Sequence, residues 1–412
     1  MNAAGNQPWH TESWFTSPWN HSDDVRGQLE FAPRVEIHDV TLRDGEQQAG
    51  VAFSADDKVR IAHALAEAGV HRIEAGLPAV SAEDFTAVKK IASMGLPSRV
   101  YAFSRCMLDD VNRAIDCGVD GVVMEIPSSR HLIELGYRWS VERAVDLSVE
   151  ATERAHEAGL EISFFPIDAT RASVRDYLDL IERVARDGHL DSLGLVDTFG
   201  VLTPQAVPGF VRASRERLGV PLEAHFHMDY GLGVANSLIA ACNGVGVIQT
   251  TVSGLGERAG NTPMEELVVA LLTLYDLDVG IDTRRLTGLA RLVGELSGVE
   301  QPSNRAVTGR RLFQVESGII ANWVSNVWDV DRTEAVPYLP ELVGQSGPEI
   351  VLGKGSGLDN VDHWLDRLGL TAGEAQRTDI LQRVKQFGLE HKRLLTEEEF
   401  AGIVRRMESS AD

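Results

Sequence analysis

The chain has 412 residues and a formal net charge of −22, with 43% hydrophobic and 24% charged residues. This ordinary globular composition allows one large domain and a smaller one. The acidic balance argues against nucleic acid as the main partner, since such proteins need a basic face to replace counterions. Three cysteines without a Cys-x-x-Cys pair, no signal-peptide pattern and no long apolar run predict a reduced, cytoplasmic protein that does not cross a membrane.

The first 33 residues differ from the rest of the chain. They are polar but contain Trp9, Trp14 and Trp19 at five-residue spacing. Large aromatic side chains usually serve as packing anchors, so we expect this arm to dock on the barrel described below or on a neighbouring subunit. A lid over the active site is the alternative interpretation.

From residue 34 onward, short apolar and β-branched runs alternate with amphipathic helical patterns. The helical pattern at 54–69 begins with Ser54 as an N-cap, and the one at 140–159 ends in glycine. The predicted strands lie at 34–41, 72–76, 98–104, 121–127, 160–166, 192–198, 222–227 and 247–254. Eight alternations predict an α/β fold, a (β/α)₈ TIM barrel. A doubly wound open sheet is the rival, but no glycine-rich fingerprint follows the first strand.

After about residue 285 the alternation stops. Residues 286–412 have helical patterns, interrupted by a glycine-rich stretch at 351–360, and residues 371–407 predict two or three helices. We therefore expect three parts: an arm (1–33), a catalytic barrel (34–285) and an appended, mainly helical C-terminal region (286–412).

The active site of such a barrel lies at the carboxyl ends of its strands. His225 and His227 stand two residues apart on the seventh strand, so both can face the mouth. Asp44 follows the first strand and Asn261 follows the eighth, and these strands are neighbours in a closed barrel. Two imidazoles and two oxygen donors suit Zn²⁺, Mn²⁺ or Mg²⁺. Isolated histidine pairs of this spacing are more often ordinary hydrogen-bonding residues.

Several spaced segments resemble those of a known superfamily. "DVTLRDGEQ" (39–47), "EAHFHMDYGLGVANSL" (223–238) and "GLGERAGNTP" (254–263) are similar to signature segments of the DRE-TIM metallolyases. The closer similarity is to the branch of 2-isopropylmalate, homocitrate and citramalate synthases. It extends over residues 34–400 and includes "VDTFGVLTP" (196–204) and "LGKGSG" (352–357).

The resemblance implies a function and a set of roles. The family reaction is a Claisen-like condensation of an acyl-CoA, here expected to be acetyl-CoA, with a 2-oxo acid to give an alkylmalate-type product. The implied enzyme is an acyltransferase and a homodimer. Its metal ligands would be Asp44, His225, His227 and Asn261.

By the same resemblance, Arg43 would bind and polarise the 2-oxo acid's carbonyl, and Thr198 would hold its carboxylate. A fixed positive charge at Arg43 suits the alkoxide that develops there. The alternative is that Arg43 simply pairs with Asp44 or Glu74.

Three departures from the family pattern concern proton transfer. Ile167 stands where a glutamate is expected after the fifth strand, Ile320 replaces a histidine, and so does Gly355. An isoleucine cannot transfer a proton. The candidates that could replace the missing groups are Glu74, His131, Asp168 and Tyr338. The departures are compatible with a role in specialised rather than primary amino-acid metabolism.

Two other functions remain open at this point. The first is a carbon–carbon lyase or aldolase on the same metal site. Hydroxymethylglutaryl-CoA lyases of this superfamily carry a cysteine after the eighth strand, and "GLGERAGN" (254–261) has none, which argues against that lyase. The second is a ligand-binding protein that has kept the metal site and lost catalysis, an interpretation supported by Ile167 and Ile320.

Overall fold

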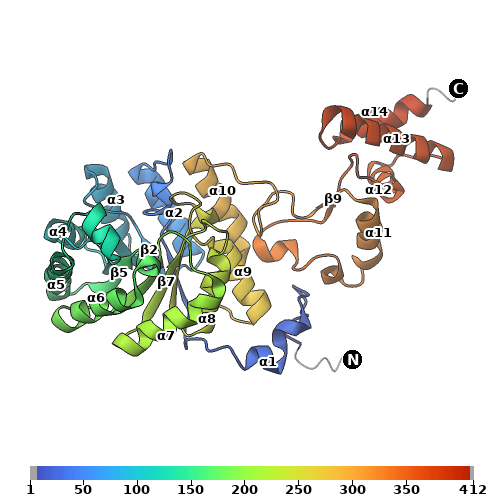
Figure 1. Ribbon diagram of the computed structural model, residues 1–412. Coiled ribbons are helices and arrows are strands. Elements are labelled where there is room, and N and C mark those ends of the chain that lie inside the picture. Colours follow the sequence, from blue (N-terminus) through green and yellow to red (C-terminus); the bar gives the residue numbers. More distant parts are fainter. Residues whose placement is uncertain (1–6, 409–412) are drawn as a thin grey trace. The chain divides into compact units, whose positions relative to one another are not determined.

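The computed structural model describes residues 7–408 and divides the chain into two compact units. One unit runs from Pro18 to Gln301 and contains the barrel. The other joins the N-terminal residues up to Ser17 with the chain from Pro302 onward. Figure 1 shows both units, and each is described below by itself. Among the described residues, no helix has both the length and the apolar character needed to cross a membrane.

The first unit is a closed barrel of eight parallel strands in sequential order (Figure 1). Strand β1 pairs with both β2 and β8, which closes the sheet. The strands are β1 (Glu36–Asp39), β2 (Arg72–Glu74), β3 (Arg99–Arg105), β4 (Gly121–Pro127), β5 (Glu161–Ile167), β6 (Ser192–Asp197), β7 (Leu222–Phe226) and β8 (Val247–Thr250). The predicted (β/α)₈ barrel is thereby confirmed.

Helices surround the barrel and several begin at a serine N-cap. The hydroxyls of Ser54, Ser81, Ser140 and Ser173 each accept a hydrogen bond from the backbone N–H three residues later, which satisfies an otherwise unpaired donor. The helices are α1 (Asp23–Arg26), α2 (Ala55–Glu67), α3 (Ala82–Ala92), α4 (Leu108–Cys117), α5 (Val141–Glu157), α6 (Val174–Asp187), α7 (Val207–Leu218), α8 (Gly233–Cys242), α9 (Met264–Tyr275) and α10 (Leu286–Ser297).

The barrel interior contains an apolar cluster, which consists of Tyr101, Phe103, Val123, Phe165 and Val196. These buried residues come from strands β3 to β6, and the partly buried Leu77 and Ile167 pack against them. Because side chains alternate along a strand, residues two positions further on also face inward, closer to the carboxyl ends. The apolar cluster therefore lies below the next inward-facing positions, which are Arg105, Glu125, Ile167 and Thr198.

The second unit is mainly helical, as predicted. Trp364 and Phe400 lie in its core, and the Trp364 indole N–H donates to the Ile350 carbonyl at 2.7 Å. Its elements are β9 (Gln314–Val315), α11 (Gly318–Val327), β10 (Glu349–Ile350), α12 (Leu358–Leu368), α13 (Glu374–His391) and α14 (Glu397–Glu408), with β9 and β10 pairing in parallel. Residues 351–357 of the glycine-rich stretch connect β10 to α12, and its last three residues begin the helix.

Two divisions of the chain differ from those drawn from the sequence. Helix α10 packs on α2, so the barrel unit ends at Gln301 rather than at residue 285. The arm is split after Ser17, and its first part belongs to the same unit as the C-terminal region. The Phe15 N–H donates to the Pro337 carbonyl at 3.1 Å, and the His10 Nε2 lies 3.0 Å from Asp331 Oδ2. Trp19 belongs to the barrel unit, where 80% of its surface is exposed.

A buried lysine fixes the turn after β1. The Lys58 ammonium on α2 lies 2.5 Å from Glu46 Oε2 and 2.6 Å from Asp84 Oδ1, and it donates to the Leu42 carbonyl at 3.3 Å. Leu42 and Glu46 flank Arg43 and Asp44 in the sequence. Lys58 therefore holds the segment that carries two of the candidate site residues.

We predict that Lys58→Met lowers the free energy of unfolding by about 3 kcal/mol, because it leaves two carboxylates without their buried cation. Lys90→Met is the matched control, since Lys90 is half exposed and pairs with the exposed Asp56 at 2.8 Å. It should cost less than about 1 kcal/mol. Urea unfolding of both variants measures the difference, and equal losses would contradict the role given to Lys58.

Candidate metal centre and active site

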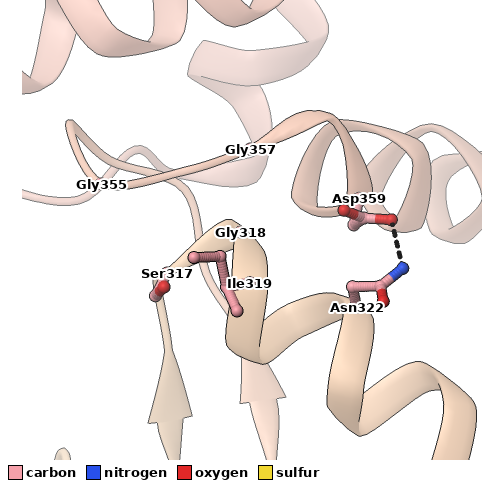
Figure 2. A pocket seen from close by; sticks show the side chains of 7 residues that line it. All are labelled: Ser317, Gly318, Ile319, Asn322, Gly355, Gly357 and Asp359. Atoms are coloured by element: carbon pink, nitrogen blue, oxygen red, sulfur yellow. Dashed lines mark hydrogen bonds between the residues drawn. The ribbon is translucent and has the colours of Figure 1, made fainter.

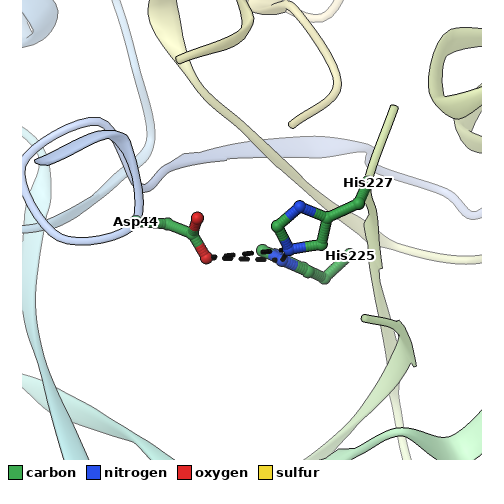
Figure 3. Close-up of side chains that lie close together, drawn as sticks. All are labelled: Asp44, His225 and His227. Carbon is green, nitrogen blue, oxygen red and sulfur yellow. Dashed lines mark hydrogen bonds and ion pairs between the residues drawn. The ribbon is translucent and has the colours of Figure 1, made fainter. Parts of the chain in front are cut away.

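Three buried side chains converge at the carboxyl end of the barrel. The ligand atoms of Asp44, His225 and His227 all lie within 4.8 Å of one another. Figure 3 shows the three side chains pointing toward one another. Asp44 Oδ2 is 3.6 Å from His225 Nε2 and 3.9 Å from His227 Nε2. The histidines come from β7 and its end, and Asp44 comes from the turn after β1. The closed order β7–β8–β1 brings them together.

Hydrogen bonds at the far side of each imidazole fix its tautomer. His227 Nδ1 lies 3.1 Å from the Gly260 carbonyl, which can only accept a hydrogen bond. His225 Nδ1 lies 3.0 Å from Gln249 Oε1, while the Gln249 amide N–H donates to Glu223 Oε2 at 3.3 Å and so sets the amide's orientation. Both imidazoles therefore carry their proton on Nδ1.

The two Nε2 atoms consequently face each other with lone pairs, 3.1 Å apart. Burial, together with the nearby His227, lowers the pKa of His225 to about 3, so the ring stays neutral at physiological pH. Two lone pairs and a carboxylate oxygen pointing at one another repel unless a cation lies between them. This arrangement fits a divalent metal ion, whose ligating histidines are usually held by such hydrogen bonds.

Asn261 completes the donor set from the loop after β8. Its backbone forms an isolated antiparallel β-bridge with that of His227. Its side-chain amide N–H donates to Asp44 Oδ1 at 2.8 Å and to the Leu255 carbonyl at 3.1 Å. Its Oδ1 is buried and has no hydrogen-bond partner among the described residues. A buried amide oxygen without a partner costs free energy, and a hard cation would remove that cost.

Two glycines allow this loop to approach the site closely. Gly256 has φ +148°, and a Cβ there would lie 2.3 Å from Asn261 Nδ2. Gly260 has φ +83°, and a Cβ there would lie 1.9 Å from the Gly254 carbonyl oxygen. A larger residue at position 256 would therefore displace Asn261, and one at position 260 would push Gly260, whose carbonyl orients His227, away from Gly254.

Arg43 adjoins the three converging side chains and pairs with both carboxylates considered for it. Its Nη1 donates to Asp44 Oδ2 at 2.6 Å, its Nε donates to Glu74 Oε1, and its guanidinium carbon lies 4.2 Å from the centroid of the Phe103 ring. Burial raises the pKa of Asp44, but the Arg43 charge acts together with His227, His225 and the Asn261 hydrogen bond, and these groups hold the pKa well below its usual range. Arg43 Nη2 is buried and has no partner among residues 7–408.

Thr198, Asp168 and His131 form a second group, around the ends of β4, β5 and β6. The Thr198 hydroxyl accepts from the Asp168 N–H at 2.8 Å, and His131 Nε2 lies 2.9 Å from Asp168 Oδ2. Arg171 binds the same carboxylate through Nε at 2.5 Å and Nη2 at 3.0 Å. Asp168 is thus fully buried and committed to its neighbours, whereas half of the His131 side chain is exposed.

Tyr338 and Ile320 lie in the other unit. The backbone of Tyr338 bridges to Trp14, and its ring centroid is 6.1 Å from that of Phe313. Ile320 lies in the first turn of α11. This unit has an open pocket of about 550 Å³, shown in Figure 2. The pocket is lined by Ser317, Gly318, Ile319, Asn322, Gly355, Gly357 and Asp359.

Two residues at the barrel site did not emerge from the sequence. Gln249 on β8 orients His225, and Glu125 on β4 faces inward two positions after Val123. The Tyr137 hydroxyl donates to Glu125 Oε1 at 3.1 Å, and burial raises the pKa of Glu125. Both are polar residues inside apolar strand runs at inward-facing positions, and this pattern could have identified them.

The fold and the converging side chains define a TIM-barrel protein with a candidate divalent-metal site. A family model described as HMGL-like matches residues 34–293, and the chain belongs to the HMGL-like family. Curated relatives named as homocitrate and 2-isopropylmalate synthases confirm the resemblance to the condensing synthases, and the match to two homocitrate synthases covers nearly their whole length.

The relatives are synthases. The chain is 35% identical to homocitrate synthase AksA of Methanothermobacter thermautotrophicus, over 97% of this chain and 99% of the relative. It is 39% identical to homocitrate synthase AksA of Methanopyrus kandleri, over 93% and 96%. It is 36% identical to 2-isopropylmalate synthase of Methanocaldococcus jannaschii, over 91% and 72%. The chain is therefore an enzyme of the synthase class.

A solved structure supports the fold. The crystal structure of hydroxymethylglutaryl-CoA lyase from Pseudomonas aeruginosa superposes with a TM-score of 0.60 at 21% sequence identity. It covers 68% of this chain and 98% of the lyase. At that identity the likeness concerns the barrel alone.

We predict that His225→Ala and His227→Ala each abolish stoichiometric binding of Mn²⁺ or Zn²⁺, because each removes one converging lone pair. Gln249→Ala should weaken metal binding by about 10- to 100-fold, since it frees the ring of His225. His189→Ala is the control, because His189 is partly exposed and pairs with Asp191 away from these side chains. Titration calorimetry measures all four, and full metal occupancy in His227→Ala would refute the ligand assignment.

Proposed function

We propose that the protein condenses an acyl-CoA, acetyl-CoA in the first instance, with a 2-oxo acid at a divalent metal ion held by Asp44, His225, His227 and Asn261. The single observation that carries this proposal is the convergence of two imidazole lone pairs and a carboxylate beside Arg43 Nη2, a buried donor with no partner among the described residues. The synthase names of the relatives point to the same reaction class.

The metal, when bound, would supply Lewis-acid polarisation and a template for the 2-oxo acid. Arg43 supplies a fixed positive charge at the 2-oxo acid's carbonyl oxygen, through Nη2, which has no partner in the described part of the chain. Glu74 and Asp44 hold the guanidinium on two sides, so the donor is oriented before substrate binds. The Thr198 hydroxyl is the proposed contact for the substrate's carboxylate, and its acceptance of the Asp168 N–H leaves its own hydrogen free to donate.

Bond changes in the proposed reaction balance with water as the only reactant besides the acyl-CoA and the 2-oxo acid. A proton leaves the acyl methyl carbon, that carbon bonds to C2 of the 2-oxo acid, and the former keto oxygen ends as a hydroxyl. Water then cleaves the thioester and releases CoA with a free thiol. Glu74 and His131 stay candidates for handling the protons, and Tyr338 is the candidate from the C-terminal unit.

We further propose that the protein works as a homodimer in the cytoplasm, with no nucleic-acid or membrane partner. The resemblance to the synthases supports the dimer. The acidic composition supports the absence of a nucleic-acid partner, and the three buried cysteines without a disulfide support the cytoplasm. The membrane expectation rests on the described residues, in which no helix is long and apolar enough to cross one.

We predict that metal-loaded protein releases CoA thiol from acetyl-CoA in the presence of at least one 2-oxo acid, detected with a thiol reagent. Arg43→Lys should lower kcat by about 10²- to 10³-fold, because lysine cannot place a planar donor between two carboxylates and the substrate. Arg105→Lys is the matched control, since Arg105 pairs with Asp110 and is more than half exposed.

Two results would count against this function. If no 2-oxo acid elicits free CoA from a metal-loaded sample, the condensation is refuted, and a binding protein that has lost catalysis becomes the better account. If CoA release proceeds at the same rate in Arg43→Lys, the role given to the guanidinium is wrong.

A further inference from the structure

The wall beside the converging ligands, on the side of strands β3 to β5, is apolar. The Phe165 ring lies edge-on to the ring of His225, with centroids 5.1 Å apart, and Phe103 lies beneath the Arg43 guanidinium. Ile167 and Leu77, which are only partly buried, pack on the same apolar cluster. A molecule held between Arg43 and the two histidines therefore meets aromatic and aliphatic carbon on this side.

The arginines around this end of the barrel are already paired with carboxylates. Arg105 on β3 binds Asp110 through two nitrogens, at 2.7 and 3.0 Å. Arg171 binds Asp168, and Arg258 binds Asp229 at 2.8 and 3.0 Å. Of these four arginines, only Arg43 has a buried nitrogen without a partner among residues 7–408, and the proposed function assigns that nitrogen to the carbonyl oxygen. Strands β3 to β5 thus offer no uncommitted cation, as far as the structure describes them, for a second acidic group.

Strand β4 presents one ionisable side chain in this region, and it is the carboxyl group of Glu125 rather than a cation. Glu125 is in register with Arg105 on β3 and Phe165 on β5, and it lies two residues beyond the inward-facing Val123. It is partly accessible, and Tyr137 donates to its Oε1 at 3.1 Å. A second carboxylate brought beside Glu125 would meet a like charge in a largely buried place, where one of the two groups must take up a proton.

We propose that the 2-oxo acid accepted by this site carries an uncharged, apolar side chain, and that Glu125 is a specificity-determining residue that excludes dicarboxylic 2-oxo acids. This inference rests on the proposed function, because it concerns the acceptor in the same reaction. The apolar cluster would pack against the uncharged side chain of the substrate. Glu125 would repel the second carboxylate of a dicarboxylic acid.

Binding to the Mn²⁺-loaded full-length protein tests the inference without relying on turnover. Pyruvate, 2-oxobutanoate and 3-methyl-2-oxobutanoate form the monocarboxylic set for titration calorimetry, and oxaloacetate and 2-oxoglutarate form the dicarboxylic set. We expect the best monocarboxylic acid to bind at least about 100-fold more tightly than either dicarboxylic acid, as expected for an unpaired like charge near a buried carboxylate.

Glu125→Gln should raise the affinity for 2-oxoglutarate by about tenfold, because it removes the like charge and keeps the shape of the side chain. The affinity for 3-methyl-2-oxobutanoate should change by less than about threefold, since that acid has no second charge. Glu134→Gln is the matched control: this half-exposed glutamate follows the same strand and pairs with Arg130, and its variant should leave both affinities unchanged. Unaltered Mn²⁺ stoichiometry in Glu125→Gln shows that the variant is folded.

The outcomes separate this inference from the proposed function. Tighter binding of a dicarboxylic acid by the native protein overturns the inference, and CoA release with that acid would still uphold the condensation. An unchanged preference in Glu125→Gln overturns the assignment to Glu125. Selective binding of monocarboxylic acids without CoA release from any of them upholds the inference and refutes the condensation. Failure of every acid to bind refutes both.

Discussion

The site depends on two hydrogen bonds that point away from it. The Gly260 carbonyl and the Gln249 amide oxygen accept the Nδ1 protons of His227 and His225, and so turn both Nε2 lone pairs toward Asp44. Without these acceptors each ring could carry its proton on either nitrogen, and the two histidines could satisfy one another. With them, the two Nε2 lone pairs and the Asp44 carboxylate oxygen face one another, and only a cation or a proton between them removes their repulsion.

Further hydrogen bonds and ion pairs in the barrel hold the groups that orient the site residues. Glu223 fixes the Gln249 amide, Arg72 pairs with Glu223 at 2.8 Å, and Lys58 fixes the turn that carries Arg43 and Asp44. These groups lie inside or just outside a closed sheet, where hydrogen bonds and ion pairs are shielded from water and hold their geometry. A scaffold of eight strands therefore positions a few atoms with little need for movement when ligands arrive.

Much of this arrangement follows from the periodicity of a strand, and the rest does not. Spacing alone predicts that His225 and His227 share a face, and the closed order of eight strands places Asp44 and Asn261 near them. The carbonyl of Gly260 could not be predicted, because its direction depends on a positive φ in a loop. Glu125 was overlooked because one charged residue in "VVMEIP" does not alter the apolar pattern. The tryptophans of the arm indicate packing but not the partner surface, and the structure pairs the backbone of Trp14 with that of Tyr338 in the C-terminal region.

The central claim is that both histidines ligate one divalent ion through Nε2. Pulsed electron paramagnetic resonance of the Mn²⁺-loaded protein, prepared with ¹⁵N-labelled histidine, measures this directly. The account predicts ¹⁵N couplings from two directly bound histidine nitrogens in native protein, and from one in a sample that retains Mn²⁺ when either histidine is replaced by glutamine. A tightly bound Mn²⁺ ion without histidine couplings would contradict the account.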